Sequence, residues 1–194
     1  MRRIHMAACT VIACSLVLST GLGAQQGKRY ALVVGIDTYG EGMTSLRTSV
    51  ADARAMKSVL ASWDTVILMS SDQEWTSPDF PTKVKVERTV RQLADRARSG
   101  DTVLLFFSGH GIQVGPGTKG TAPGQYLLPV DADLGRPAET AVHLESMLGL
   151  LEDRGVKRIV TMVDACREEV ATTKGIGVRG LSAPAEAGGA ASGQ

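Results

Sequence analysis

The chain alternates short apolar runs with stretches whose apolar residues recur at helical spacing. The apolar runs are six to eight residues long and rich in β-branched side chains. Such runs are typical of strands that are buried on both faces of a parallel sheet. Four of them predict strands, at Arg29–Ile36, Asp64–Ser70, Thr102–Phe107 and Val156–Val163.

The stretches between these strands predict helices, because their apolar residues return every three or four positions. They span Val50–Trp63, Val86–Ala97 and Leu144–Leu151. Ser49 offers an N-cap to the first helix, while Gly100 and Gly155 stop the second and the third. A Gly- and Pro-rich stretch, Ile112–Gly124, predicts a long loop with a hairpin leading into Tyr126–Val130. The alternation predicts an α/β fold, with a mostly parallel sheet covered on both faces.

Length, charge and cysteine content narrow the class of protein. The 194 residues suit one domain with short tails, and 43% hydrophobic residues argue against a disordered chain. A formal charge of +1 shows no excess of basic residues of the kind that binds nucleic acid, so we expect no nucleic-acid partner. Three cysteines are too few for a disulfide scaffold.

Residues 1–24 have the pattern of a secretory signal peptide. Arg2 and Arg3 form a positive n-region, Met6–Leu18 is apolar, and small residues stand at Gly21 and Gly23. Cleavage after position 23 or 24 would export the mature chain to the periplasm or beyond the cell.

Two alternatives for this segment remain open. An uncleaved membrane anchor is one, because the apolar stretch is nearly long enough to span a bilayer. The other is a lipid on Cys14, since Val11–Cys14 resembles a loose lipobox. After cleavage only Cys166 remains, and it is either a buried inert thiol or a reactive one.

Chemically useful residues follow two of the predicted strands. The carboxyl ends of parallel strands meet at one edge of a sheet, where sites form. His110 follows the third predicted strand and Cys166 follows the fourth. A thiolate attacks carbonyl carbon and an imidazole transfers protons, while backbone N–H groups near Gly111 and Cys166 are candidates for an oxyanion hole. Taken singly, either side chain is as well explained as a loop histidine or a small buried hydrophobe.

The sequence around the cysteine matches part of the caspase signature. His110 lies 56 positions before Cys166, close to the spacing in that signature. The signature also fits at 165–167, whereas Asp164 and Glu168 depart from it.

Together with Phe106–Gly111 and Tyr126–Asp131, these motifs make Arg29–Leu181 resemble the caspase-like cysteine peptidases (peptidase family C14), and among them the bacterial metacaspase-like branch. The resemblance implies a caspase-haemoglobinase-like α/β/α sandwich, of which this chain holds the p20-type catalytic portion. It also implies a cysteine-type endopeptidase that acts on protein or peptide, with Cys166 as nucleophile and His110 as general base and acid. The alternative is an inactive caspase-like module that binds a partner.

The resemblance also predicts the residues that select the substrate. Metacaspases cleave after Arg or Lys, and the matching acids here are Asp164, two residues before the nucleophile, and Asp52, at the start of the first helix. Two carboxylates would favour a guanidinium through bidentate bonds. Other roles stay open, because Ser49 to Asp52 is also a capping-box pattern, Asp164 can accept loop N–H bonds, and Arg47 in the same loop would favour acidic substrates.

We expect no metal and no other cofactor. Some metacaspases need calcium, but Asp131 and Asp133 alone fall far short of a cation cage. His143 and His5 have no partners at metal-ligand spacing.

The end of the chain departs from the family pattern. In the family, further strands follow the nucleophile and complete the sheet, and residues 179–181 resemble the start of that region. Residues 182–194 hold no β-branched or aromatic side chain and predict a disordered tail. We therefore expect a caspase-like domain over residues 28–181 that lacks its C-terminal strands, either as a fragment or as a truncated domain. It would leave a sheet edge open to self-association.

Overall fold

The structure is a computed structural model that describes residues 27–40, 42–117, 120–167 and 178–179. The predicted signal peptide (1–24) and the predicted tail (182–194) lie outside these described residues. Among the described residues, no helix is long and apolar enough to cross a membrane.

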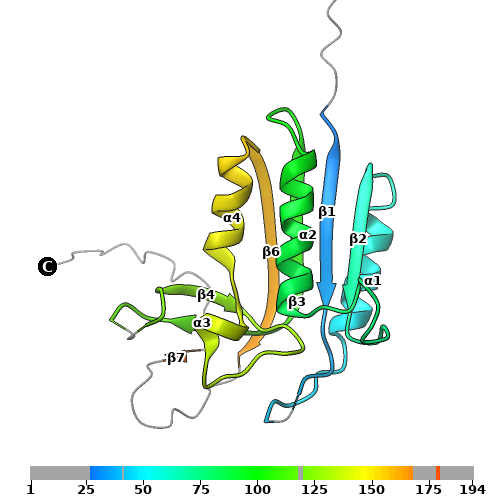
Figure 1. Ribbon diagram of the computed structural model, residues 1–194. Helices are drawn as coiled ribbons and strands as arrows, with labels where there is room; N and C mark the ends of the chain where they lie inside the picture. Colours follow the sequence, from blue (N-terminus) through cyan, green and yellow to red (C-terminus); the bar gives the residue numbers. More distant parts are fainter. Residues whose placement is uncertain (1–26, 41, 118–119, 168–177, 180–194) are drawn as a thin grey trace, which may run out of the picture.

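Four parallel strands form the centre of the molecule, in the order β2–β1–β3–β6 (Figure 1). They are β1 (Arg29–Gly35), β2 (Thr65–Ser70), β3 (Thr102–Val114) and β6 (Arg158–Arg167). Each contains most of one predicted strand, so the predicted parallel sheet is confirmed.

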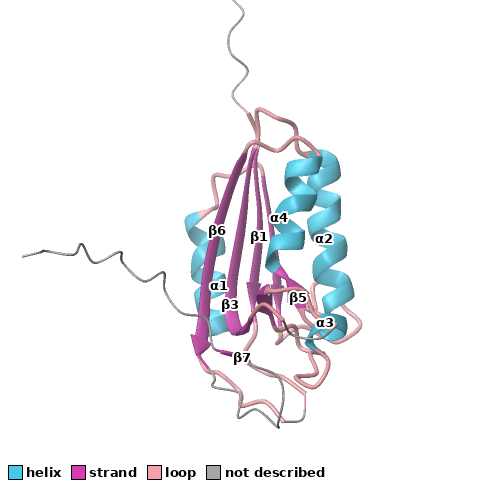
Figure 2. Ribbon diagram, turned by 90° about the vertical axis from the view of Figure 1, so that its left-hand side faces the viewer, coloured by secondary structure: helices cyan, strands magenta, loops and turns pink. Residues whose placement is uncertain are grey.

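Helices cover both faces of this sheet, which confirms the predicted α/β/α sandwich (Figure 2). One face carries α1 (Ser49–Val59), and the other carries α2 (Lys83–Arg96) and α4 (Leu144–Asp153). The first helix ends earlier than its apolar spacing predicts. Leu60 is its C-cap, and the Trp63 N–H donates to the Leu60 carbonyl oxygen (2.9 Å). Trp63 therefore lies in a turn after the helix, and its side chain packs against the core under α1.

The two faces bury very different amounts of apolar surface. Among the described residues, twenty buried side chains form the core under α2 and α4, from Tyr30 in β1 to Val156. Six form the core under α1, including Ala53 and Leu60. We call these faces the thick face and the thin face. On the thin side of β6, Val160 and Met162 remain 42% and 43% exposed.

The strand β3 is longer than predicted and changes partners along its length. Its first part pairs in parallel with β1 and β6, and its last residues pair antiparallel with β4 (Gly124–Leu127) and β7 (Val178–Arg179). The predicted loop therefore begins after Val114 rather than at Ile112, whereas the predicted hairpin is confirmed by the antiparallel pairing of β3 with β4. Because β1 ends at Gly35, β4 takes that side of β3, and Ile112 becomes 1% exposed.

The last parallel strand also extends beyond its prediction. It starts at Arg158 rather than Val156 and pairs residue by residue with β3, from Thr102↔Arg158 to Gly111↔Arg167. The prediction that residues 164–167 follow the strand as a loop was wrong. Two short elements, α3 (Pro137–Thr140) and β5 (Val142–His143), had no predicted counterpart.

Candidate active site

His110 lies within β3, two positions past the residue that pairs with the end of β1. Its backbone N–H donates to the Tyr39 hydroxyl oxygen (2.7 Å), and the two rings lie 4.8 Å apart at a tilt of 43°. The side chain is only 2% exposed. Gly109 permits this contact, since a Cβ there would lie 2.6 Å from the Tyr39 hydroxyl. Gly109 therefore allows Tyr39 to approach the strand closely beside His110.

The segment between β1 and α1 also fixes the proton on the imidazole of His110. Its Nε2 lies 2.7 Å from the carbonyl oxygen of Thr44. A carbonyl oxygen only accepts hydrogen bonds, so Nε2 must carry the proton in this contact. In the neutral ring, Nδ1 is then the nitrogen that can accept a proton.

The register of β3 and β6 brings the backbone of Cys166 beside that of His110. The two residues are Cα partners on adjacent parallel strands, although they are 56 positions apart in the sequence. Neighbouring strands lie about 4.8 Å apart. The two residues predicted to form the dyad thus occupy neighbouring positions in the sheet.

Gly111 occupies the next position in the same ladder. It pairs with Leu127 of β4 on one side and with Arg167 of β6 on the other. The predicted strand ended at Phe107, whereas β3 continues through Gly111. Its assignment to the oxyanion hole stays a prediction.

Asp52 lies in the first turn of α1 and is half-buried. The predicted N-cap at Ser49 was wrong, since Thr48 occupies that position without a side-chain hydrogen bond. The carboxylate of Asp37 caps the helix instead, accepting from the backbone N–H of Ser49 (2.8 Å) and of Val50 (3.4 Å).

Asp164 is exposed and pairs in register with Ser108. Leu104 and Phe106 of β3 pack under α1, so alternation along the strand places Ser108 and His110 on the thin face as well. Asp164 shares this face, and α1 starts at the same end of the sheet, where a Cβ on Gly35 would lie 2.5 Å from the Ser49 carbonyl oxygen. The predicted specificity acids therefore share one face and one end of the sheet with His110. Arg47 is exposed in the segment before α1.

The carboxylates of Asp131 and Asp133, which were considered as calcium ligands, accept hydrogen bonds from groups of the protein. The Lys83 backbone N–H donates to Asp131 (2.8 Å), while Gly135 N–H and Arg136 Nε donate to Asp133 (2.8 and 3.0 Å). The bond from Gly135, followed by that from Arg136, lowers the pKa of Asp133 below its ordinary 3.8. Among the described residues, no group of three or more His, Cys, Asp or Glu could hold a metal ion.

Sequence reasoning did not identify Tyr39 or Thr44 as part of the site. Tyr39 stands two positions after the Asp37 that ends the first apolar run, which was the only available signal. Thr44 contributes a main-chain carbonyl, which any residue carries, so its side chain could not reveal the contact.

Comparisons with known proteins show which family this chain resembles. The family model described as the caspase domain (Peptidase_C14) matches residues 28–192. Metacaspase-1 of Ajellomyces capsulatus is 31% identical over 149 residues, which cover 72% of this chain and 40% of that protein. Metacaspase-3 of Arabidopsis thaliana is 31% identical over 93 residues, covering 45% of this chain and 25% of that protein. This chain therefore spans well under half the length of these relatives.

A solved structure shares the fold. The crystal structure of protein GSU0716 from Geobacter sulfurreducens has a TM-score of 0.54 and 22% sequence identity, covering 72% of this chain and 50% of that one. At this identity the likeness concerns the fold alone. The match of the family model to most of the chain is the stronger finding, and it shows that the chain belongs to the caspase-domain family, peptidase family C14.

Proposed function

We propose that the protein is a cysteine-type endopeptidase in which Cys166 is the nucleophile and His110 the general base and acid. The observation that carries this proposal is the register of β3 and β6, which makes these two residues partners on adjacent strands. Membership of the caspase-domain family supports the same chemistry.

The hydrogen bond of His110 to Thr44 defines the direction of proton transfer. With Nε2 held by the carbonyl oxygen, Nδ1 takes the proton from the Cys166 thiol as sulfur attacks the scissile carbonyl carbon. Backbone N–H groups at Gly111 and Cys166 would stabilise the oxyanion. The imidazolium then gives its proton to the leaving amine, and water hydrolyses the thioester by the reverse transfers.

We propose Arg, and secondarily Lys, as the residue before the cleaved bond. Asp52 and Asp164 lie on the face and at the end of the sheet where His110 lies. Two carboxylates match the bidentate geometry of a guanidinium better than the point charge of an ammonium.

Labelling by an electrophilic peptide tests the proposal. An acyloxymethyl ketone with Arg in the first position should label the full chain at Cys166, as read by peptide mapping. The Cys166→Ala variant controls for the other thiols, and His110→Asn should slow labelling by about a hundredfold or more, because general-base catalysis contributes that much. A folded chain that is not labelled, or is labelled equally without His110, would overturn the dyad.

Turnover of matched peptides tests the specificity. Peptides with Arg, Lys or Asp before the cleaved bond should be cleaved in that order, and Asp164→Asn should reduce the advantage of Arg. Faster cleavage after Asp would contradict the assignment of the two acids.

The proposed reaction needs no cofactor, because thiol and imidazole supply both the nucleophile and the proton transfers. We therefore expect equal turnover in chelator and in millimolar calcium. A large activation by calcium would contradict this expectation.

A second candidate function is a caspase-like module that binds a partner through β6. The observation in its favour is the exposure of Val160 and Met162 on this strand, which pairs only with β3 among the described residues. An unpaired edge with apolar side chains favours pairing with another chain, including a second copy. A dimer that Met162→Lys dissociates, together with absent labelling of Cys166, would favour this function.

We also propose export to the periplasm or the exterior, based on the signal-peptide pattern of residues 1–24. The N-terminus of the mature protein, determined by mass spectrometry after cell fractionation, tests it. Cleavage near position 23 is expected, whereas an intact start or a lipid on Cys14 would point to the two membrane-attached alternatives.

A further inference from the structure

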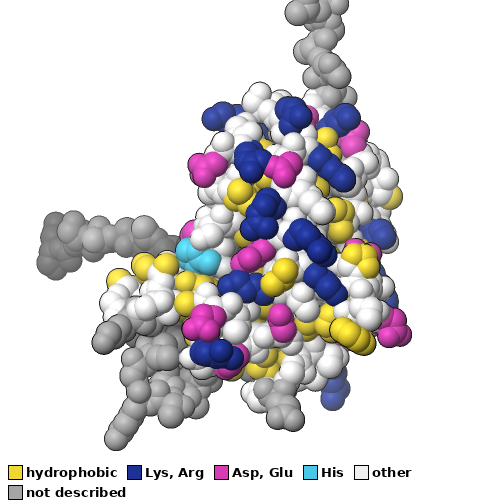
Figure 3. Space-filling model, in the orientation of Figure 1, with side chains coloured by type: hydrophobic (Ala, Val, Ile, Leu, Met, Phe, Trp, Pro, Cys, Tyr) yellow, Lys and Arg dark blue, Asp and Glu magenta, His cyan; other side chains and the backbone are white. Residues whose placement is uncertain are grey.

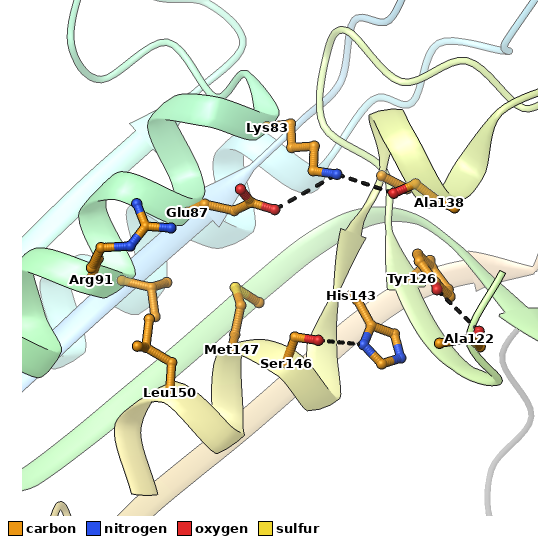
Figure 4. A pocket seen from close by; sticks show the side chains of 12 residues that line it. Lys83, Glu87, Arg91, Ala122, Tyr126, Ala138, His143, Ser146, Met147 and Leu150 are labelled. Atoms are coloured by element: carbon orange, nitrogen blue, oxygen red, sulfur yellow. Dashed lines mark hydrogen bonds and ion pairs between the residues drawn. The ribbon is translucent and has the colours of Figure 1, made fainter. Parts of the chain in front are cut away.

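A cavity of about 410 Å³ opens on the thick face, between α2 and α4 (Figure 4). Lys83, Glu87 and Arg91 of α2 form one wall, and α4 forms the opposite wall. Tyr126 of β4 and His143 close one end. This volume falls within the range of small-molecule sites. The cavity is separate from the proposed active site, since His110 lies on the thin face.

Hydrogen bonds within the protein hold the walls of the cavity in place. Lys83 Nζ donates to the carbonyl oxygens of Ala138 (3.3 Å) and Glu139 (2.8 Å), linking α2 to α3. The Tyr126 hydroxyl donates to the Ala122 carbonyl oxygen (3.0 Å), and His143 Nδ1 lies 2.7 Å from Ser146 Oγ. The cavity is therefore preformed, and a ligand would lose little free energy in ordering it.

Lys83 and Arg91 are the lysine and arginine side chains that line the cavity. Lys83 Nζ lies 3.8 Å from Glu87 Oε1. Arg91 forms no ion pair among the described residues. Its guanidinium, with five N–H donors, is thus the cationic group left to meet a ligand at this wall.

Both helices also contribute apolar side chains to the cavity. Val90 of α2 and Met147 of α4 line it and are buried, and Leu150 of α4 lines it as well. An apolar lining next to one uncompensated cation suits a ligand with an apolar body and an anionic end.

The surface around Arg91 strengthens this charge preference. Lys and Arg side chains gather over α2 on this face of the molecule (Figure 3). The helix carries five basic residues against Glu87 and Asp95, namely Lys83, Lys85, Arg88, Arg91 and Arg96. Such a field concentrates anions near the opening.

We propose that the cavity between α2 and α4 binds a carboxylate attached to an apolar group, with the guanidinium of Arg91 on the carboxylate and Val90, Met147 and Leu150 around the apolar part. This chemistry has two sources, a free organic acid and the C-terminal residue of a peptide. The site is a further binding site, independent of the proposed peptidase activity.

The Met147 methyl group provides a direct reporter of binding. Carbon-13 methyl spectra of the methionine-labelled full chain, with the Met147 signal assigned by loss in Met147→Leu, would be titrated with 4-phenylbutyrate and with acetyl-Ala-Leu. We expect a saturable shift of the Met147 signal with at least one of these probes. The corresponding amides, 4-phenylbutyramide and acetyl-Ala-Leu-amide, should bind about tenfold more weakly, as expected on losing a charge-assisted hydrogen bond. Tighter binding of the dipeptide would identify a peptide terminus as the source, and tighter binding of phenylbutyrate a free acid.

Three variants of α2 complete the test. Arg91→Gln should weaken binding of the carboxylate by about tenfold. Arg88→Gln is the matched control, because Arg88 is exposed on the same helix and does not line the cavity. Glu87→Gln should tighten binding several-fold, since it removes the anion that faces the ligand. Equal binding of acids and amides, equal effects at positions 91 and 88, or no saturable shift with any probe would overturn the proposal.

Discussion

The two faces of the sheet differ in how completely they are covered. The thick face carries α2 and α4 over a core of twenty buried side chains, and the thin face carries α1 over a core of six, counted over the described residues. His110 and both candidate specificity acids lie on the thin face. The described residues thus concentrate their apolar burial, and with it most of their hydrophobic stabilisation, on the face opposite His110.

The largest expected effect tests whether the core of the thick face contributes more to stability than the core of the thin face. Leu93→Ala removes a fully buried side chain of the thick core, and Leu60→Ala removes one from the thin core. We expect losses in unfolding free energy of about 3–5 kcal/mol and about 2–3 kcal/mol respectively, because a cavity in a dense core is filled less by relaxation. Urea unfolding followed by circular dichroism measures both. An equal or larger loss of unfolding free energy in Leu60→Ala would contradict the greater contribution of the thick core.

A second prediction concerns the close packing of α1 against β1 on the thin face. In Gly35→Ala, the new methyl group would lie 2.5 Å from the Ser49 carbonyl oxygen and 2.6 Å from the Ala53 Cβ. We expect a loss of about 1–3 kcal/mol in unfolding stability, measured by thermal and urea unfolding. Gly149→Ala in α4 is the control on the thick face. No atom lies within 4 Å of its added methyl group, so the helix should gain about 0.5–1 kcal/mol. Destabilisation of similar size in both variants would exclude a specific clash at Gly35.

Removing the hydroxyl of Tyr39 tests whether this residue positions His110 for catalysis or only contributes to the stability of the fold. Tyr39→Phe leaves the buried His110 N–H without this acceptor, at a cost of about 1–3 kcal/mol. If the proposed dyad operates, kcat should fall about tenfold or more through misplacement of the imidazole. Tyr30→Phe is the matched control, since Tyr30 is buried in the thick core. An equal loss of kcat in both variants would contradict a positioning role of Tyr39, and a pH–rate profile would show whether the titration of His110 has moved.

A smaller effect is expected at the start of α1. Asp37→Ala removes the acceptor for the N–H groups of Ser49 and Val50. Loss of an N-terminal cap destabilises a protein by about 1 kcal/mol. Chemical denaturation measures the loss, and Asp52→Ala is the control within the same helix turn. A larger loss for Asp52→Ala would restore the capping-box interpretation of Asp52.

The smallest effect lies outside both faces, in the loop before α3. The pKa of Asp133 is lowered by hydrogen bonds from Gly135 and Arg136, so its carboxylate stabilises the folded state above the unfolded pKa. This contribution disappears as the pH falls from about 4 through the lowered pKa of the folded state. Unfolding free energies of the wild type and Asp133→Asn should therefore converge toward pH 2. A difference between them that does not change from pH 6 to pH 2 would contradict this linkage.

The parts of the fold that the sequence predicted are those where local pattern and tertiary packing agree. The apolar runs at Arg29–Ile36 and Asp64–Ser70 became β1 and β2 within a residue at each end. Glycines misled the prediction at residues 108–111, because Gly109 and Gly111 resemble chain breakers but are accommodated within a strand. Their tolerance depends on Tyr39 and on pairing with β4, which are distant in the sequence.

The candidate site shows the same limit. The residue types and the 56-residue spacing suggested His110 and Cys166, and the strand register then placed them side by side. The capping of α1 by Asp37 and the contact of His110 with Thr44 depend on how one loop folds over the sheet. No periodicity in the sequence encodes such contacts.

The strand order has a consequence for synthesis on the ribosome. Chains emerge from the N-terminus and begin to fold in that order. The strands β1, β2 and β3 are complete before β6 is made, so His110 of β3 is synthesised before Cys166 of β6. The two members of the proposed dyad therefore come together only when the last parallel strand of the central sheet joins β3, which makes the pairing of β6 the step that would assemble the proposed site.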